Sequence, residues 1–235
     1  IAGRSEGELY ALVDEAVKES MAYDKNSILE ESKKSKVQLE KIVRMTKLTM
    51  LVLAKQLEAG NFIPFDFERI FGEKDNLDAL NIDLKNNSKM YLRGKIDRVD
   101  ICEDNDKTLV KIIDYKTGNM KWEMDMPYYG RALQLVIYLD AVMEQLAKEG
   151  REILPAAFFY YHIDAPFLTR DEAKKENAFL KKLKPSGIVN TDLDIIKHLD
   201  KSIETDSDVI PVSIKKDGSF SQYSTVASTQ RINLL

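Results

Sequence analysis

The stretch Leu109-Val-Lys-Ile-Ile-Asp-Tyr-Lys-Thr-Gly118 decides the fold. Its apolar run predicts a strand from Leu109 to Tyr115, and apolar side chains on both faces place that strand centrally in a sheet. Alternate side chains of a strand point to the same face, so Asp114 and Lys116 project together at its end. A carboxylate beside an ammonium group can hold a divalent cation and stabilise developing negative charge.

A second predicted strand, Met90 to Ile101, precedes this stretch and is joined to it by a polar loop. If the two strands pair as a hairpin, Asp97 and Asp114 reach one edge of the sheet beside Lys116. Such oxygen ligands suit Mg²⁺ or Mn²⁺, which would lower the pKa of a bound water. Exposed strand ends that form surface ion pairs would show the same spacing, so the spacing leaves both interpretations open.

Three further residues are candidates for supporting roles. Glu68 lies in the alternating segment Phe62–Phe71, which predicts a strand, and it is either a third acid or a solvent-facing residue. Gln134 and Tyr138 are four residues apart in a predicted helix, Gly130–Glu149, and therefore face the same direction. They could reach a metal-bound phosphate or a nucleic-acid backbone, or they could form a helix surface with a half-buried tyrosine.

The remaining periodicity completes an outline of the fold. The other predicted helices are 6–21, 27–59, 171–183 and 192–200, and the other predicted strands are 77–84, 153–163 and 209–215. Helices followed by strands with an inserted helix indicate an α/β or α+β fold, with a sheet flanked by helices. We expect a single domain over 1–235, with a helical lead-in (1–60), a catalytic core (61–163) and an extension (164–235).

Composition limits the classes of function. The 235 residues are 44% hydrophobic and 31% charged, which is typical of a globular protein. The net charge of −4 gives no general attraction to nucleic acid or to an anionic membrane. A single cysteine, Cys102, excludes an internal disulfide and a multi-cysteine metal cluster within this chain. His162 and His198 lack ligand spacing, so we expect a structural role for the first and a solvated position for the second.

Taken in order, three motifs resemble the RecB-like branch of the PD-(D/E)XK nucleases. They are Gly94-Lys-Ile-Asp97-Arg-Val-Asp100, then Asp114-Tyr-Lys116-Thr-Gly118, then Gly130 with Leu133-Gln134-Leu135 and Tyr138. The flanking segments Asn61–Gly72, Pro155–Tyr161 and Ile214–Gly218 are similar to the AddB component of AddAB-type helicase–nucleases. The similarity covers most of the chain from about residue 10 onward.

This resemblance implies a restriction-endonuclease-like core with a central mixed sheet, and a metal-dependent DNA exonuclease activity. It implies Asp97 and Asp114 as Mg²⁺ or Mn²⁺ ligands and Lys116 as the catalytic lysine, with Glu68, Gln134 and Tyr138 in support. The domain would belong to a cytoplasmic helicase–nuclease complex that processes double-strand breaks for recombinational repair. Its partners would be an AddA-type subunit and single-stranded DNA delivered by the helicase, with no membrane involved.

Two departures from the family keep alternatives open. The family carries a histidine upstream of these motifs and four cysteines for an iron–sulfur cluster, and this chain has neither set. We expect that both ends are truncated and that the cluster belongs to the full-length family member. The alternative is a catalytically weak or inactive nuclease-fold module that guides DNA or contacts the partner subunit. The AddB-like flanks argue against a third possibility, a stand-alone RecB-like or Cas4-like nuclease.

Overall fold

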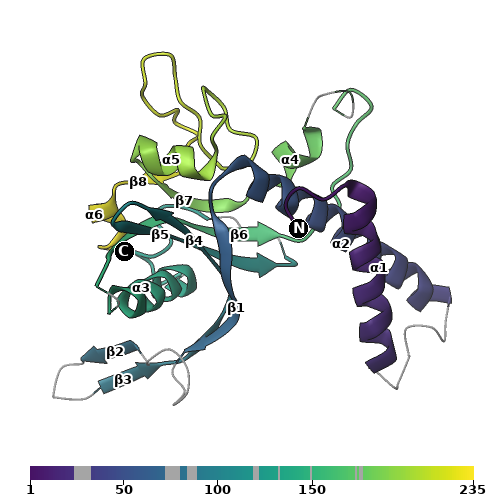
Figure 1. Ribbon diagram of the computed structural model, residues 1–235, viewed down its shortest axis with the longest axis horizontal. Coiled ribbons are helices and arrows are strands. Elements are labelled where there is room, and N and C mark those ends of the chain that lie inside the picture. Colours follow the sequence, from purple (N-terminus) through teal and green to yellow (C-terminus); the bar gives the residue numbers. More distant parts are fainter. Residues whose placement is uncertain are drawn as a thin grey trace. The chain divides into compact units, whose positions relative to one another are not determined.

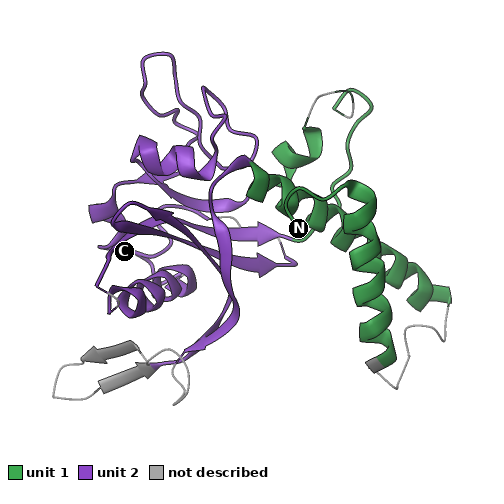
Figure 2. Cartoon of the chain, in the orientation of Figure 1, with its two compact units in different colours: residues 1–58, 163–183 green, residues 59–162, 184–235 purple. Residues whose placement is uncertain are grey.

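The computed structural model describes most of the chain in two compact units (Figure 2). The described residues are 1–23, 33–71, 80–83, 89–118, 122–131, 133–148, 150–172, 174 and 177–235. Unit 1 comprises Ile1–Glu58 and Ile163–Leu183, and unit 2 comprises Ala59–His162 and Lys184–Leu235. The predicted single domain and its three subdivisions stay predictions.

Unit 1 is helical. Its elements are α1 (Glu6–Tyr23), most of α2 (Lys33–Ala59) and α4 (Ala178–Lys182), and the predicted start of the second helix at 27–32 lies outside the described residues. Asp14 of α1 forms an ion pair of 2.7 Å with Lys47 of α2. The helix predicted over 171–183 is wrong in length, because Asn177 has a left-handed backbone (φ 56°) that interrupts a continuous helix.

Unit 2 contains a six-stranded mixed sheet in the order β1-β4-β5-β6-β7-β8. These strands are Ile63–Phe71, Gly94–Asp104, Lys107–Lys116, Glu152–His162, Ser186–Asn190 and Val226–Ala227. The pairs β5–β6 and β7–β8 are parallel, and the other pairs are antiparallel. A separate two-stranded sheet comprises β2 (Leu80–Asp83) and β3 (Lys89–Leu92). The predicted α/β class, the hairpin and the central position of the strand that ends at Lys116 are confirmed.

Helix α3 (Leu133–Ala147) connects the parallel strands β5 and β6 and covers one face of the sheet (Figure 1). Its apolar stripe packs against the apolar side chains of that face. The core between them includes Leu135, Leu139, Val142, Val99, Val110, Ile112 and Phe158. Because apolar residues recur on one side of α3 and also occupy the facing side of β5, helix and sheet bury complementary surfaces.

The last third of unit 2 departs most from the sequence-based expectations. Residues 209–215 form no continuous strand; two isolated bridges, Asp206–Ser213 and Ile214–Phe220, occur there instead. Tight turns around the Ser207 hydroxyl, which accepts hydrogen bonds from two following N–H groups, prevent an extended run. Helix α5 (Leu193–Leu199) lies inside the predicted range 192–200, whereas β7, β8 and α6 (Thr229–Ile232) were not predicted.

Candidate active site

The β4–β5 register places Asp97 and Asp114 beside each other. Arg98 pairs with Ile113 in this antiparallel ladder, so the next residues along the same register are Asp97 and Asp114. An oxygen of Asp97 accepts a hydrogen bond of 2.8 Å from the backbone N–H of Tyr115. The negative charge of Asp97 also contributes to raising the pKa of Asp114. The predicted hairpin therefore brings the two carboxylates together.

Asp114 is buried and has few partners. Its exposed fraction is 2%, and its Oδ2 atom lies 2.5 Å from Nζ of Lys116. Among the described residues, Oδ2 has this ion pair but no hydrogen bond of acceptable geometry. Burial raises the pKa of Asp114, and the neighbouring ammonium group of Lys116 only partly opposes that effect. An additional cation at this carboxylate would therefore favour its ionised form.

A chain of polar contacts runs from Lys116 into helix α3. Lys116 Nζ donates a hydrogen bond of 3.2 Å to Gln134 Oε1, and Gln134 Nε2 donates one of 2.8 Å to the hydroxyl oxygen of Tyr138. Gly94 makes room for this tyrosine, since a Cβ atom there would lie 2.9 Å from its ring and 2.5 Å from the ring of Phe71. The shared direction predicted for Gln134 and Tyr138 is confirmed, and Gln134 holds the lysine.

Glu68 lies beside Asp97 on the neighbouring strand, but its side chain points away from the carboxylate pair. The β1–β4 register places Glu68 opposite Asp97, between the flanking pairs. Its carboxylate instead forms an exposed ion pair of 2.7 Å with Lys95. Glu68 also has a left-handed backbone (φ 53°), which costs about 1–2 kcal/mol for a residue with a side chain. Its role as a supporting acid stays a prediction.

Tyr160 is a site residue that the sequence reasoning missed. It pairs with Asp114 across the parallel β5–β6 ladder, and its side chain is 0% exposed. Nζ of Lys116 lies 5.5 Å from the centre of the Tyr160 ring, within the range of a cation–π contact. A tyrosine in an apolar strand is most simply a core residue, so no signal in the sequence marked this one as a neighbour of the carboxylates.

The donor set is compatible with a divalent cation such as Mg²⁺. Within the described ranges, no group of three or more His, Cys, Asp and Glu side chains is arranged to hold a metal. Mg²⁺ nevertheless needs only one or two carboxylates, because it keeps several of its water ligands. The buried, under-satisfied Oδ2 of Asp114 beside Asp97 supplies such a pair.

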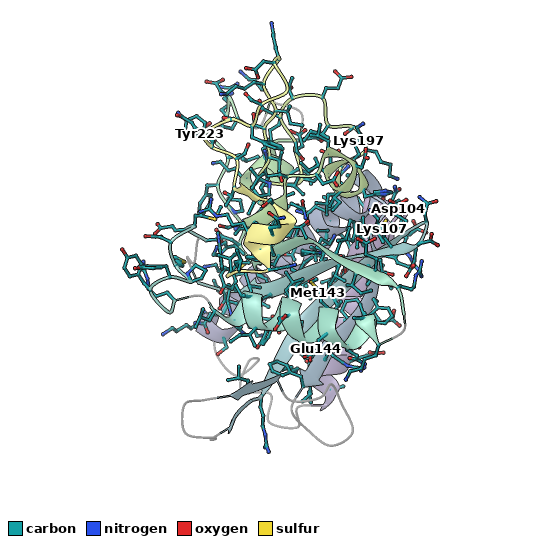
Figure 3. The ribbon with its side chains drawn as sticks, turned by 90° about the vertical axis from the view of Figure 1, so that its left-hand side faces the viewer. Asp104, Lys107, Met143, Glu144, Lys197 and Tyr223 are labelled. Atoms are coloured by element: carbon teal, nitrogen blue, oxygen red, sulfur yellow. The ribbon has the colours of Figure 1, made fainter. Side chains whose placement is uncertain are left out.

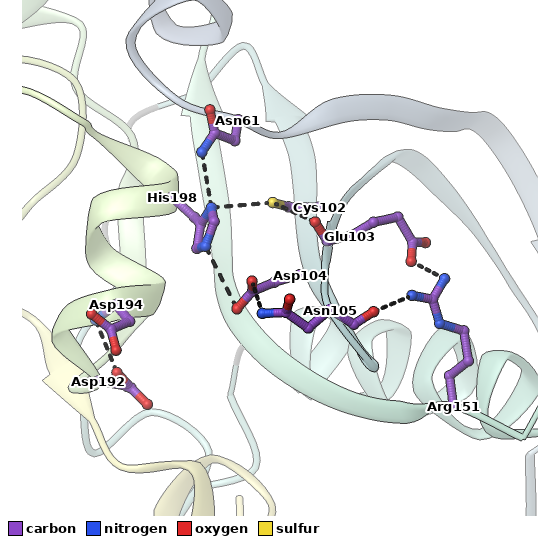
Figure 4. Close-up of polar contacts among 9 residues, drawn as sticks. All are labelled: Asn61, Cys102, Glu103, Asp104, Asn105, Arg151, Asp192, Asp194 and His198. Atoms are coloured by element: carbon purple, nitrogen blue, oxygen red, sulfur yellow. Dashed lines mark hydrogen bonds and ion pairs between the residues drawn. The ribbon is translucent and has the colours of Figure 1, made fainter.

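The far end of the β4–β5 hairpin carries a second polar cluster, which has a structural role (Figure 4). His198 Nδ1 lies 2.9 Å from Asn61 Nδ2 and 3.4 Å from Cys102 Sγ, so the predicted solvated position of His198 is wrong. Burial raises the pKa of the Cys102 thiol, which disfavours a reactive thiolate. A Cβ atom at Gly60 would lie 2.6 Å from the His198 carbonyl oxygen, so glycine permits this close backbone approach. The cluster ties α5 to the hairpin.

Hydrophobicity gives no sign of a membrane-spanning element in the described part of the chain. No helix there is both long enough and apolar enough to cross a bilayer.

The family model described as the PD-(D/E)XK nuclease superfamily matches residues 2–211. Three similar relatives are each named as the B subunit of an ATP-dependent helicase/deoxyribonuclease. The protein from Thermoanaerobacter sp. (strain X514) is 37% identical over 214 residues, which are 88% of this chain and 18% of the relative. That from Clostridium tetani is 37% identical over 229 residues (95% and 20%), and that from Bacillus cereus is 36% identical over 206 residues (83% and 18%).

The chain thus spans about a fifth of the length of these relatives. Nucleases of the matched superfamily generally use divalent metal ions. The match covers most of the chain, including both strands of the hairpin and helix α3. The chain therefore belongs to the PD-(D/E)XK nuclease superfamily.

Proposed function

We propose that this chain is a metal-dependent DNA exonuclease domain that hydrolyses phosphodiester bonds. One observation carries the proposal: the buried carboxylate of Asp114 lies next to Asp97 with Lys116 as its ion-pair partner. Burying a carboxylate with so little compensation costs free energy, and such groups concentrate where charge is needed for chemistry. The superfamily match supports the same interpretation.

Each residue has a proposed role. Asp97 and Asp114 would hold Mg²⁺ or Mn²⁺, which when bound polarises a phosphate oxygen and lowers the pKa of a water. Lys116 would neutralise negative charge at the attacked phosphate. Gln134 would keep the ammonium group in place through its 3.2 Å contact, and Tyr138 would fix the Gln134 amide.

We further propose that the domain works within a helicase–nuclease complex that processes double-strand breaks for recombinational repair. The names of the relatives support this setting, since each is the B subunit of an ATP-dependent helicase/deoxyribonuclease. The partner would be an AddA-type subunit, and the location would be the cytoplasm. A net charge of −4 suits a domain that receives single-stranded DNA from a motor rather than capturing DNA alone.

Cleavage of an end-labelled single-stranded oligonucleotide tests the proposal. With Mg²⁺ or Mn²⁺ we expect cleavage that EDTA abolishes, and we expect Lys116→Gln to slow it by about 10²–10³-fold, as for other lost electrostatic stabilisers. Lys107→Gln is the matched control, because Lys107 lies on the same strand at the opposite end of the hairpin, beside Asp104 (Figure 3). Equal cleavage by both variants would contradict the assignment.

One observation favours a second candidate, a module that binds DNA without cutting it. The predicted third acid, Glu68, is held by Lys95 away from the carboxylate pair. In that case the wild-type protein would shift the oligonucleotide in a gel at every metal concentration and leave it intact. Cleavage that depends on Lys116 would exclude this candidate.

A further inference from the structure

The connection between β5 and α3 exposes two adjacent tyrosines. Tyr128 is 87% exposed and Tyr129 is 64% exposed, although most of each side chain is apolar. Their ring centres lie 5.2 Å apart with an angle of 86° between the ring planes, so one ring meets the other edge-on. An exposed pair of large aromatic rings in contact is typical of a surface that binds a ligand.

The surrounding loop holds the two rings in a fixed arrangement. Tight turns close it, since the N–H of Gly130 donates to the Pro127 carbonyl at 3.0 Å and that of Arg131 donates to the Met126 carbonyl at 2.8 Å. Near the start of the loop, Trp122 is 6% exposed and belongs to the core of unit 2. Because the loop is already ordered, a ligand that stacks on its tyrosines loses little free energy to ordering the protein.

A positive charge accompanies the tyrosines. The guanidinium carbon of Arg131 lies 5.9 Å from the centre of the Tyr129 ring, within the range of a cation–π contact, and Arg131 is exposed. It can therefore also contact a phosphate group. The same loop carries two exposed acids, Glu123 and Asp125, so charge alone attracts an anionic polymer only weakly. The open aromatic rings are therefore the main source of affinity that this loop offers.

The tyrosines lie close to the candidate active site. Tyr129 precedes Gln134 by five residues, and Gln134 contacts Lys116. An extended chain spans at most about 3.6 Å per residue, so the Cα atoms of Tyr129 and Gln134 lie within about 18 Å of each other. About five nucleotides cover that length at a spacing of roughly 3.4 Å along a stacked strand. A DNA strand bound at Lys116 therefore reaches the tyrosines within a few nucleotides.

We propose that Tyr128 and Tyr129 form a stacking platform for the bases of single-stranded DNA, with Arg131 contacting a backbone phosphate. An unpaired base stacks on Tyr128, the more exposed ring, and Tyr129 supports that ring from the side. Every base has a flat π face, so the platform accepts any sequence. This choice of ligand rests on the proposed nuclease function.

The size of the platform also favours DNA over a protein partner. Two aromatic side chains bury about 150–250 Å² each, whereas a stable protein interface needs about 800 Å² on each side. A single stacked base needs no more than one open ring, and Tyr128 supplies it.

Anisotropy of a fluorescein-labelled oligothymidylate, measured in EDTA so that no metal-dependent cleavage occurs, tests the platform. We expect Tyr128→Ala to weaken binding about 5- to 100-fold, the scale of one lost base–aromatic stack. Tyr223→Ala is the matched control, because Tyr223 is 83% exposed and lies apart from Met143 and Glu144 of α3 (Figure 3). It should bind within about twofold of the wild type. Equal affinities of the two variants would overturn the platform.

An abasic oligonucleotide of the same length separates stacking from charge. It keeps the phosphates but has no bases, so the wild type and Tyr128→Ala should bind it equally, to within about twofold. Arg131→Gln should weaken binding of both strands and reduce the salt dependence by about 0.7 in the slope of log K against log salt, the value for one phosphate contact. A loss in Tyr128→Ala that is as large on the abasic strand as on oligothymidylate would overturn stacking.

Failure of the platform and failure of the proposed function give different results. If the wild type cleaves DNA with Mg²⁺ but Tyr128→Ala binds oligothymidylate as Tyr223→Ala does, the nuclease function stands and the platform is overturned. If binding depends on Tyr128 but no divalent metal supports cleavage, the platform stands and the nuclease function is overturned. A wild type that binds no single-stranded DNA would also overturn the platform.

Discussion

Two buried carboxylates of the β4–β5 hairpin, Asp100 and Asp114, differ in how many partners the fold gives them. Asp100 is 0% exposed and receives the Nε and Nη2 atoms of Arg98 at 2.6 and 2.8 Å, and Lys111 Nζ at 2.9 Å. Asp114 is 2% exposed and has one ion pair, with Lys116. The first carboxylate is saturated with partners, and the second is not.

The two carboxylates also lie on different faces of the sheet. Asp100 pairs directly across the ladder with Lys111, so these two side chains share one face. Asp114 lies an odd number of residues from Lys111 along β5, and it therefore lies on the opposite face. That opposite face is the one covered by α3, from which Gln134 reaches Lys116. One face of the hairpin thus carries a fully paired charge network, and we propose that the other face keeps charge available for chemistry.

The largest effect should follow from removing the charge of Asp100, the carboxylate that is saturated with partners. Asp100→Asn leaves Arg98 and Lys111 as buried cations without a counter-charge, so we expect the free energy of unfolding to fall by about 3–5 kcal/mol. Urea denaturation measures this change. Asp104→Asn, at the end of the same strand, should cost less than about 1 kcal/mol. Similar losses in both variants would contradict the structural role of the Asp100 network.

A smaller effect, on catalysis, should follow from removing the hydrogen bond that holds Lys116. Gln134→Leu removes the 3.2 Å acceptor of Lys116 but keeps the helix, so we expect cleavage to slow about tenfold, as for one lost hydrogen bond. Steady-state kinetics on labelled oligonucleotide measures it. Glu144→Gln, an exposed change on the same helix, is the control and should leave the rate unchanged. A normal rate for Gln134→Leu would remove Gln134 from the site.

The incomplete pairing of Asp114 should also affect the pH dependence of stability. Because the folded state raises the pKa of Asp114, the folded protein binds this proton more tightly than the unfolded chain does. The stability from Asp114 is therefore complete below the unfolded pKa of about 4 and is lost as the pH rises through the higher folded pKa. In metal-free denaturation series, the wild type should lose stability relative to Asp114→Asn over that window. If the wild type instead gained stability relative to Asp114→Asn as the pH rises, the raised pKa of Asp114 would be contradicted.

The smallest effect concerns Glu68, which has a strained, left-handed backbone. Glu68→Gly relieves a left-handed backbone but adds chain entropy in the unfolded state, so we expect a net stabilisation of no more than about 1 kcal/mol. The ion pair with Lys95 is exposed and contributes little. Thermal unfolding measures the change, and Lys95→Ala reports the contribution of the ion pair alone. A loss well above that size would show that the Glu68 side chain stabilises the fold.

Much of the hairpin was predictable because its signals are local. Apolar patterns predicted β5, most of β4 and their pairing, and helical spacing predicted that Gln134 and Tyr138 face together. The single strand predicted over 90–101 is wrong at its start, because residues 90–92 belong to β3 in the separate two-stranded sheet. The five-residue strand β7, Ser186–Asn190, was missed because it is too short for a periodic pattern. The helix over 171–183 was overextended because a single left-handed residue, Asn177, leaves no mark on periodicity.

The site was predictable only where adjacency follows from one hairpin. Asp97 and Asp114 lie on the two strands of a single ladder, so their proximity needs no information beyond the turn. Tyr160 reaches Asp114 through the parallel β5–β6 register, which a crossover helix sets and sequence spacing does not. The direction of Glu68 depends on its backbone conformation, which no pattern of side chains encodes.

Single-turnover cleavage by Asp114→Asn, compared with Asp100→Asn below the melting temperature of both, tests the central claim most directly. We expect Asp114→Asn to stay folded and to lose at least about 10²-fold in Mg²⁺-dependent cleavage, the scale of a lost electrostatic stabiliser. Asp100→Asn should be less stable, but its folded fraction should cleave at a rate near that of the wild type. Wild-type cleavage by Asp114→Asn would contradict the assignment of this face to catalysis.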